Sequence, residues 1–208
     1  MQPVAFDTET GLIRPALLAP PLVCVTWQRP GGAPEIEHHT TAEPTIRAWL
    51  DDPDTILVGH NVAYDLAVVA ERFPDLRPAI FAAYDADRVT DTQIRQQLLD
   101  IAAGTYRGRL DAKGRRVEYK YDLQALAKRL AGIELAKDGW RLSYANFLDT
   151  PLERWEEKAR EVQAAAAPRI AELRAELEAL PAKDPRRKPY ESELAGLVEM
   201  VASDPSRG

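Results

Sequence analysis

The feature that most constrains the fold is the alternation of short strand-like runs with helical stripes along much of the chain. Four runs have strand character and are separated by turns that contain Pro and Gly. They are residues 3–6, 22–28, 34–40 and 55–59. Apolar residues recur at helical spacing in three further segments, 43–50, 63–73 and 92–103. Strands that alternate with helices are typical of α/β proteins, so we expect a mixed sheet with flanking helices.

The C-terminal part of the chain has a different pattern. Residues 152–179 are rich in Ala, Glu and Arg and carry one apolar stripe, which the prolines of residues 181–185 interrupt. A second stripe follows, formed by Leu194, Leu197, Val198 and Val201. Two stripes around a proline turn predict an antiparallel helical hairpin, with arms of about 20–28 residues or roughly 30–40 Å. We therefore expect an α/β domain over residues 1–152 and a helical hairpin over residues 153–208.

The composition excludes several classes of protein. No apolar run approaches the ~18 residues that a membrane-spanning helix needs, and the N-terminus lacks the features of a signal peptide. Cys24 is the only cysteine, which excludes intrachain disulfides and CxxC-type metal sites. We therefore expect a soluble, intracellular protein without membrane association, in which any metal ion has oxygen or histidine ligands.

The charge distribution indicates where nucleic acid would bind. The chain has 27 Lys and Arg against 33 Asp and Glu, a net charge of −6, which is unlike a protein that coats duplexes. Residues 107–129 are the exception, with eight Lys and Arg against three acidic residues. The turn signal at residues 111–114, together with Tyr119 and Tyr121 at alternating positions, predicts a basic β-hairpin. We expect its cations to contact a nucleic-acid backbone and its tyrosines to offer stacking faces.

Three carboxylates lie beside the ends of two predicted strands. Asp7 and Glu9 follow the first strand and, being two residues apart on an extended backbone, face the same side. Asp65 lies in the first turn of the helix that follows the strand 55–59. A DxE pair alone is typical of a polar turn, and Asp65 shifts the interpretation towards a metal site. Carboxylate oxygens suit Mg²⁺ and Mn²⁺, and two such ions can clamp the attacking and leaving oxygens of a phosphodiester.

Two motifs around these carboxylates resemble those of a known family. Phe6-Asp-Thr-Glu-Thr10 resembles the first motif, DxE, of the DnaQ-like DEDD 3′–5′ exonucleases. Asn61-Val-Ala-Tyr-Asp65 resembles their second motif, NxxxD. The most similar subtype is the proofreading exonuclease domain of family A DNA polymerases, cellular or phage. The resemblance covers about residues 3–155, including the stretches 89–92 and 123–132.

The resemblance implies an RNase H-like fold in which Asp7 and Glu9 bind the catalytic metal and Asp65 serves a second metal. The implied cofactor is Mg²⁺ or Mn²⁺, as a two-metal site. The resemblance also implies substrate contacts by residues in or beside the two motifs. Those on the 3′-terminal nucleotide are Thr10 and Leu12 or Ile13, and those on its sugar and base are Asn61 and Tyr64.

The implied activity is exonucleolytic hydrolysis. A hydroxide on the metal attacks the terminal phosphodiester at the 3′ end of single-stranded DNA and releases a nucleoside 5′-monophosphate. The likeness to family A implies proofreading during DNA replication, with a DNA polymerase as partner, in the cytoplasm of a bacterial or phage-infected cell. The residues themselves do not separate DNA from RNA substrates. The alternative is a catalytically incomplete module that binds nucleic acid or a polymerase.

The family's third motif, YxxxD or HxAxxD on a late helix, has no counterpart in this sequence. Tyr144 and Asp149 are five residues apart rather than four, so on a helix they do not share a face. One explanation is that the helical hairpin is an insertion and that the motif lies beyond Gly208 or on a second chain. The other is a site that is complete but degenerate. With three carboxylates we expect weak metal binding, an empty or singly occupied site, and an exposed apolar sheet surface near Asp7.

Overall fold

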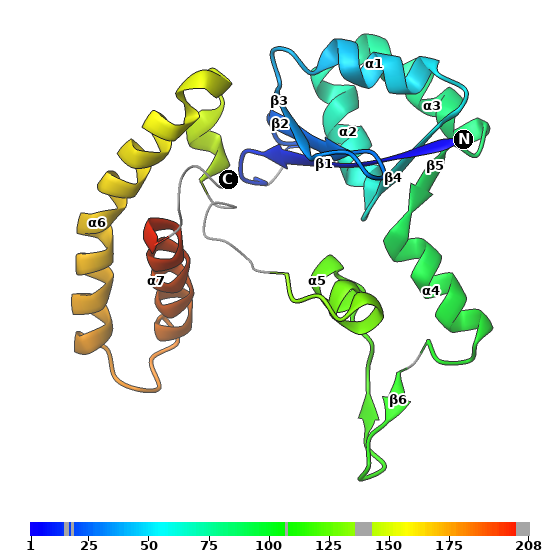
Figure 1. Ribbon diagram of the computed structural model, residues 1–208. Helices are drawn as coiled ribbons and strands as arrows, with labels where there is room; N and C mark the ends of the chain where they lie inside the picture. The colour runs from blue at the N-terminus through cyan, green and yellow to red at the C-terminus, as the bar shows by residue number, and fades with distance from the viewer. Residues whose placement is uncertain (15–16, 18, 107, 136–142, 203–208) are drawn as a thin grey trace. The chain divides into compact units, whose positions relative to one another are not determined.

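The computed structural model describes residues 1–14, 17, 19–106, 108–135 and 143–202 (Figure 1). The chain forms two compact units. The first contains Met1–Thr8 and Cys24–Ala136, and the second contains Glu9–Val23 and Lys137–Gly208. The expected boundary between an exonuclease-like domain and a hairpin domain near residue 152 stays a prediction.

A five-stranded mixed sheet organises the first unit, with β1 at its centre. The strand order is β3-β2-β1-β4-β5. The strands are β1 (Gln2–Thr10), β2 (Leu22–Gln28), β3 (Glu35–His38), β4 (Thr55–Gly59) and β5 (Val89–Asp91). Strands β1, β4 and β5 are parallel, whereas β2 and β3 are antiparallel to each other. This order and this mixture of directions are those of the RNase H-like fold, which confirms the predicted fold class.

Helices cover the face of the sheet that is opposite to Asp7. Three of them lie on this side (Figure 1): α1 (Glu43–Asp51), α2 (Val62–Arg72) and α3 (Arg77–Asp85). The buried Phe6 of β1 points towards them, since its ring centroid lies 6.1 Å from that of Trp49 in α1. Because side chains alternate along a strand, Asp7 points to the other face. Hydrophobic packing under the sheet therefore leaves the acidic face of β1 accessible.

A second group of elements follows β5 in the same unit. Helix α4 (Thr92–Ala102) begins at Asp91, whose carboxylate accepts hydrogen bonds from the backbone N–H groups of Gln93 and Ile94. A two-stranded ribbon and a short helix come next. They are β6 (Arg109–Leu110), β7 (Arg116–Val117), α5 (Leu123–Leu126) and its π-helical continuation η2 (Ala127–Ala131). The antiparallel pairing of β6 with β7 confirms the predicted hairpin.

The structure differs from the sequence analysis in three places. The first strand runs to Thr10, so Asp7 and Glu9 lie within it rather than after it, because polar side chains on an exposed face do not end a backbone ladder. Residues 89–91, for which no strand is expected, form β5 because their backbone pairs with β4. The sequence pattern also misses α3, where only Ile80 and Ala83 are buried and the apolar stripe is too short to recognise.

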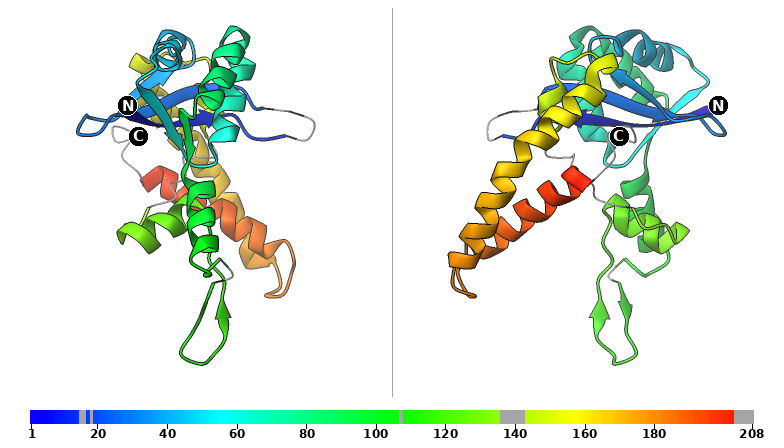
Figure 2. Two further views of the ribbon diagram at one scale, coloured as in Figure 1. Left: turned by 90° about the vertical axis from the view of Figure 1, so that its right-hand side faces the viewer. Right: turned by 60° about the vertical axis from the view of Figure 1, so that its left-hand side comes forward.

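The second unit is built on an antiparallel pair of helices (Figure 2). Helix α6 (Trp155–Ala179) continues through Pro168, and α7 (Arg187–Ala202) follows the proline turn. Two short 3-10 turns precede them, η4 (Tyr144–Phe147) and η5 (Leu152–Arg154). This unit has its own core, made of Val23, Phe147, Ala159, Ala166 and Met200. The predicted helical hairpin is confirmed. Among the described residues, no helix has the length and hydropathy that crossing a bilayer requires.

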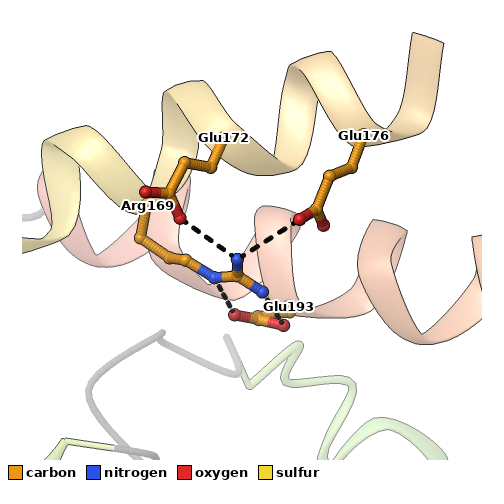
Figure 3. A network of polar contacts seen from close by, with 4 residues as sticks. All are labelled: Arg169, Glu172, Glu176 and Glu193. Atoms are coloured by element: carbon orange, nitrogen blue, oxygen red, sulfur yellow. Dashed lines mark hydrogen bonds and ion pairs between the residues drawn. The ribbon is translucent and has the colours of Figure 1, made fainter. Parts of the chain in front are cut away.

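A polar network joins the two long helices (Figure 3). The Arg169 guanidinium of α6 lies 2.9 Å from Glu193 of α7, and 3.3 Å and 3.9 Å from Glu172 and Glu176 of its own helix. Hydrogen bonding to Glu193 is the main cause that raises the pKa of Arg169 above its ordinary value. The side chain is 39% exposed, so solvent screens these attractions and their contribution to stability is modest.

Candidate active site

The two acidic motifs meet through a buried contact between Thr8 and Asp65. Asp65 lies in the first turn of α2 and is 2% exposed. Its Oδ1 atom accepts two hydrogen bonds from Thr8 of β1, one from the backbone N–H at 3.0 Å and one from the hydroxyl at 2.6 Å. Because Thr8 is the central residue of the DxE motif, this contact fixes α2 against the strand that carries Asp7.

The surroundings of Asp65 oppose its ionisation. Burial, and secondarily the charge of Asp7, raise the pKa of the Asp65 carboxyl to about 6, although the hydrogen bonds from Thr8 act in the opposite direction. Asp7 and Asp65 are therefore close enough to repel each other when both are ionised. A bound cation would remove this repulsion.

One carboxylate positions the helices on both sides of the site. Besides capping α4, Asp91 accepts hydrogen bonds from the backbone N–H groups of Asn61 at 3.3 Å and Val62 at 3.0 Å, where α2 begins. Asn61 adopts the left-handed conformation at φ 61° and ψ 41°, which Asn tolerates better than most residues. At Gly59 a Cβ atom would lie 2.7 Å from the Val62 side chain, so the turn into α2 requires glycine. Asp91 is thus a structural cap.

A cavity of about 340 Å³ lies beside Asp7 in the first unit. Its lining comes from strands β1, β2 and β4, the loop after β2, and the starts of α4 and α5. The residues are Ala5, Phe6, Asp7, Thr26, Trp27, Gln28, Pro34, Val58, Gly59, His60, Thr92 and Leu123. Ala5 is exposed and Val58 is half-buried, and the expected exposed apolar sheet surface near Asp7 stays a prediction. The cavity is open to a ligand that approaches the carboxylate.

His60 lines this cavity, and a hydrogen bond to Thr92 orients its ring. The Thr92 hydroxyl donates to the Gly59 carbonyl oxygen at 3.0 Å, and His60 Nδ1 lies 3.0 Å from the same hydroxyl. Since the hydroxyl has one proton, which it donates to Gly59, Nδ1 of His60 must donate to Thr92. The other ring nitrogen of His60, Nε2, is buried and has no hydrogen-bond partner among the described residues. The same is true of Nε1 of Trp27. The spacing of residues in the sequence assigns no role to His60 or Trp27. The only sequence signal for His60 is its position between a strand and the NxxxD motif.

The other predicted site residues lie along the same two segments. Glu9 follows Asp7 by two positions in β1 and therefore shares its side of the strand. The Thr10 hydroxyl donates to the carbonyl oxygen of Gly11 at 2.9 Å. Leu12 and Ile13 are 51% and 71% exposed. Glu9 to Ile13 belong to the second compact unit. In the first unit, Asn61 is exposed and Tyr64 is half-buried in the first turn of α2.

The donor chemistry of Asp7 and Asp65 suits a hard divalent cation, because such ions prefer carboxylate oxygens. Burial is the main cause of the raised pKa of Asp65, and the charge of Asp7 adds to it; a cation would relieve this second contribution. In the parts of the chain that the structure describes, no three His, Cys, Asp or Glu side chains are grouped to hold a metal ion. Tyr144 lies in a 3-10 turn with Asp149 just beyond it, so this pair does not form a helical YxxxD motif.

Comparison with solved structures identifies similar nuclease folds. The chain is similar to the EXO domain of Nibbler from Aedes aegypti, with 12% identity, 72% of this chain and 66% of that chain covered, and a TM-score of 0.48. It is similar to RNase D from Escherichia coli, an exoribonuclease involved in structured RNA processing, with 20% identity, 97% and 45% coverage and a TM-score of 0.45. It is also similar to NrnC from Brucella melitensis bound to pGG, with 18% identity, 96% and 82% coverage and a TM-score of 0.46. The chain thus spans just under two thirds of the Nibbler domain and less than half of the RNase D chain.

Comparison with sequences gives the family. A search of curated proteins finds no match. The sequence model of the exonuclease domain of family A DNA polymerases, described as 3′-5′ exonuclease, matches residues 1–154. The matched region is most of the chain and contains both acidic motifs and the Thr8–Asp65 contact. The chain therefore belongs to this family of 3′–5′ exonucleases.

Proposed function

We propose that this exonuclease chain acts on the 3′ end of single-stranded DNA, with a divalent metal ion, in the proofreading of DNA synthesis. The observation that carries the proposal is the buried Thr8–Asp65 contact, which holds the NxxxD carboxylate beside the DxE strand. The family match favours DNA as substrate. Because solved nucleases similar to this chain include an exoribonuclease, RNA is the substrate that the experiment below must compare.

In this proposal Asp7, Glu9 and Asp65 hold Mg²⁺ or Mn²⁺. When bound, such an ion would stabilise the charge that develops on the scissile phosphate. The oxygen of a water molecule attacks the terminal phosphorus and the bond to the 3′ oxygen of the preceding nucleotide breaks. That oxygen takes up a proton, and a nucleoside 5′-monophosphate is released. Thr8 keeps Asp65 in position throughout, through its two hydrogen bonds.

Residues at the edge of the site would bind the terminal nucleotide. We assign Asn61 and Tyr64, at the start of α2, to its sugar and base. We assign Thr10 and the exposed Leu12 and Ile13 to the same nucleotide, because exposed apolar side chains next to a catalytic strand offer a surface on which a base can stack. These roles, and the metal-binding roles of the three carboxylates, are proposals of the same kind.

The test is a nuclease assay on 5′-labelled single-stranded DNA and RNA of one sequence, with Mg²⁺ or Mn²⁺. The proposal expects a ladder that shortens from the 3′ end, faster on DNA, and nucleoside 5′-monophosphates as products. The Asp7→Ala variant should lose this activity. Equal activity of the variant would reveal a contaminating nuclease, and faster cleavage of RNA would overturn the assignment to DNA.

A second candidate is a catalytically incomplete module that binds nucleic acid or a polymerase. It is favoured by the absence, among the described residues, of a three-ligand metal group. Its signature is oligonucleotide binding by the wild-type chain without hydrolysis at any metal concentration. If adding a polymerase or a second chain that carries YxxxD then produces activity, the site is completed by that partner.

A further inference from the structure

We propose that the ribbon β6–β7 and the residues that follow it, residues 108–121, form an arm that binds the phosphate backbone of the substrate strand away from the cleaved end. This inference rests on the proposed nuclease function. It adds that the protein favours substrates of several nucleotides over dinucleotides. We call residues 108–121 the basic arm.

The charges of the basic arm are available for binding. Arg109, Lys113, Arg116 and Lys120 are exposed and make no ion pair with any residue that the structure describes. Arg115 is the exception, since its guanidinium lies 2.9 Å from Asp111. The segment 107–129 carries eight Lys and Arg against three acidic residues in a chain of net charge −6. A polyanion is therefore repelled by most of the protein and attracted to this segment.

Specific backbone contacts shape the arm at its base and at its tip. Gly108 has φ 89°, and a Cβ atom there would lie 2.0 Å from the Val117 carbonyl oxygen, so only glycine lets the two strands close. At the tip, Asp111 accepts hydrogen bonds from the backbone N–H groups of Lys113 at 2.8 Å and Arg115 at 2.9 Å. Gly114 completes the turn with φ 73°. The cations are thus held on a preformed ribbon.

A cluster at the end of α4 anchors the arm. The Arg129 guanidinium of η2 lies 4.1 Å from the Tyr119 ring centroid and 5.3 Å from that of Tyr121. Arg129 and the Tyr121 hydroxyl both donate to the buried Asp100 carboxylate, each at 2.8 Å. The Tyr106 ring, 46% exposed, stacks on Tyr121 at 5.8 Å. Because the arm is already ordered, binding loses less conformational entropy than it would with a flexible segment.

The distance between the cavity and the arm determines how long a substrate must be to contact the arm. Helix α4 starts at Thr92, which lines the cavity beside Asp7, and its eleven residues span about 16 Å before the arm begins. Figures 1 and 2 show the ribbon beyond the end of α4 that is farther from the sheet. At about 3.4 Å per nucleotide of a stacked strand, 16 Å corresponds to roughly five nucleotides. A dinucleotide in the cavity would not reach the arm, whereas a longer strand would.

The test compares two triple variants of the full chain. Lys113→Gln/Arg116→Gln/Lys120→Gln removes three cations from the arm. Arg174→Gln/Lys183→Gln/Lys188→Gln removes the same number of exposed cations from the helical hairpin, where they make no ion pair with described residues.

Binding of a labelled 20-nucleotide single strand is measured by anisotropy, without divalent metal, over a range of salt concentrations. The arm variant should bind roughly tenfold more weakly or worse, and its log–log salt slope should fall by about 2, because each lost phosphate contact contributes about 0.7 on single strands. The control should match the wild type, and Lys113→Arg/Arg116→Lys/Lys120→Arg should keep the slope.

Catalysis supplies a second readout. The value of kcat/KM on the 20-nucleotide strand should fall with the arm variant, while kcat/KM on a dinucleotide stays unchanged. An unchanged salt slope in the arm variant, or an equal loss in the hairpin variant, would overturn the inference. If the wild type binds the strand through the arm but hydrolyses nothing, the proposed function fails and the arm is retained. The two failures are therefore distinguishable.

Discussion

The contact between Thr8 and Asp65 and the network around Arg169 are both polar, but they lie in opposite environments. Asp65 is buried and its Oδ1 atom accepts from Thr8; burial, and secondarily the like charge of Asp7, raise the pKa of its carboxyl to about 6. Arg169 is half-exposed and has three carboxylates around it. Removing the Arg169 network should destabilise the protein less than removing the Thr8–Asp65 contact, because water replaces exposed ion pairs but not buried hydrogen bonds. A raised pKa in a buried acid is more typical of a functional site than of a structural one.

Asp65→Asn tests this contrast with the largest expected effect. The amide keeps the shape of the side chain and can still accept from Thr8, but it cannot bind a cation as a carboxylate does. We expect nuclease activity to fall by roughly a hundredfold or more, because the ion loses an anionic ligand. The matched control is Glu178→Gln, an exposed position on α6, and it should leave the rate unchanged. Comparable losses in both variants would show that Asp65 has no special role.

The stability of the metal-free protein should respond to pH through the same group. The folded-state pKa of Asp65, about 6, lies above the ordinary value of 3.8, so the folded state binds this proton more tightly than the unfolded state does. Its contribution is therefore fully present below pH 4 and is lost as pH rises through 6. At pH 8, Asp65→Asn should raise the free energy of unfolding by at most about 3 kcal/mol. Urea titrations at pH 4 and pH 8, with chelator, measure the difference; a variant less stable than the wild type at pH 8 would contradict the raised pKa.

Thr8→Val should have a smaller effect on the same contact. Valine keeps the backbone N–H donor and removes the hydroxyl donor, so we expect a loss of about 1–2 kcal/mol at pH 8. The pKa of Asp65 should rise further, because a hydrogen bond that lowers it is lost. NMR titration of the Asp65 carboxyl in both proteins checks the direction. Thr8→Ser, which retains the hydroxyl, serves as control, and a fall of the pKa in the valine variant would count against this account.

Arg169→Gln should have the smallest effect, although it breaks the most contacts. We expect a small loss of stability, which becomes smaller still at high salt because the ion pairs are exposed to solvent. A double-mutant cycle with Glu193→Gln isolates the contact between the two helices. A coupling larger than the effect of Thr8→Val, and unresponsive to salt, would show that the network holds the helices together, and the contrast between the two regions would fail.

Much of the fold could be predicted because its elements have local signals. The first four strands and the long helices carry apolar patterns, and the Gly and Pro turns separate them. Strand β5 could not be predicted, because three residues beside β4 give no pattern of their own. Asp91 does have a recognisable position before a helix, but its bonds to Asn61 and Val62 cross about thirty residues of sequence.

The candidate site shows the same division. The carboxylates of Asp7 and Asp65 could be proposed from motif spacing, since each lies at a defined place on a strand or helix. The roles of Thr8 and His60 could not, because they depend on contacts that only the folded chain creates. Thr8 meets a residue 57 positions away, and His60 is oriented by Thr92, 32 positions away. Whether Glu9 completes the metal site stays a prediction.

The double cap at Asp91 has a structural consequence. The Asp91 carboxylate accepts hydrogen bonds from the first turns of α2 and α4. The opposite end of α4 carries the Asp100 cluster that anchors the basic arm. Asp91 lies at the start of both helices, and Asp65 lies in the first turn of α2. The helix that carries Asp65 and the helix that leads to the basic arm therefore share one hydrogen-bonding group at their starts.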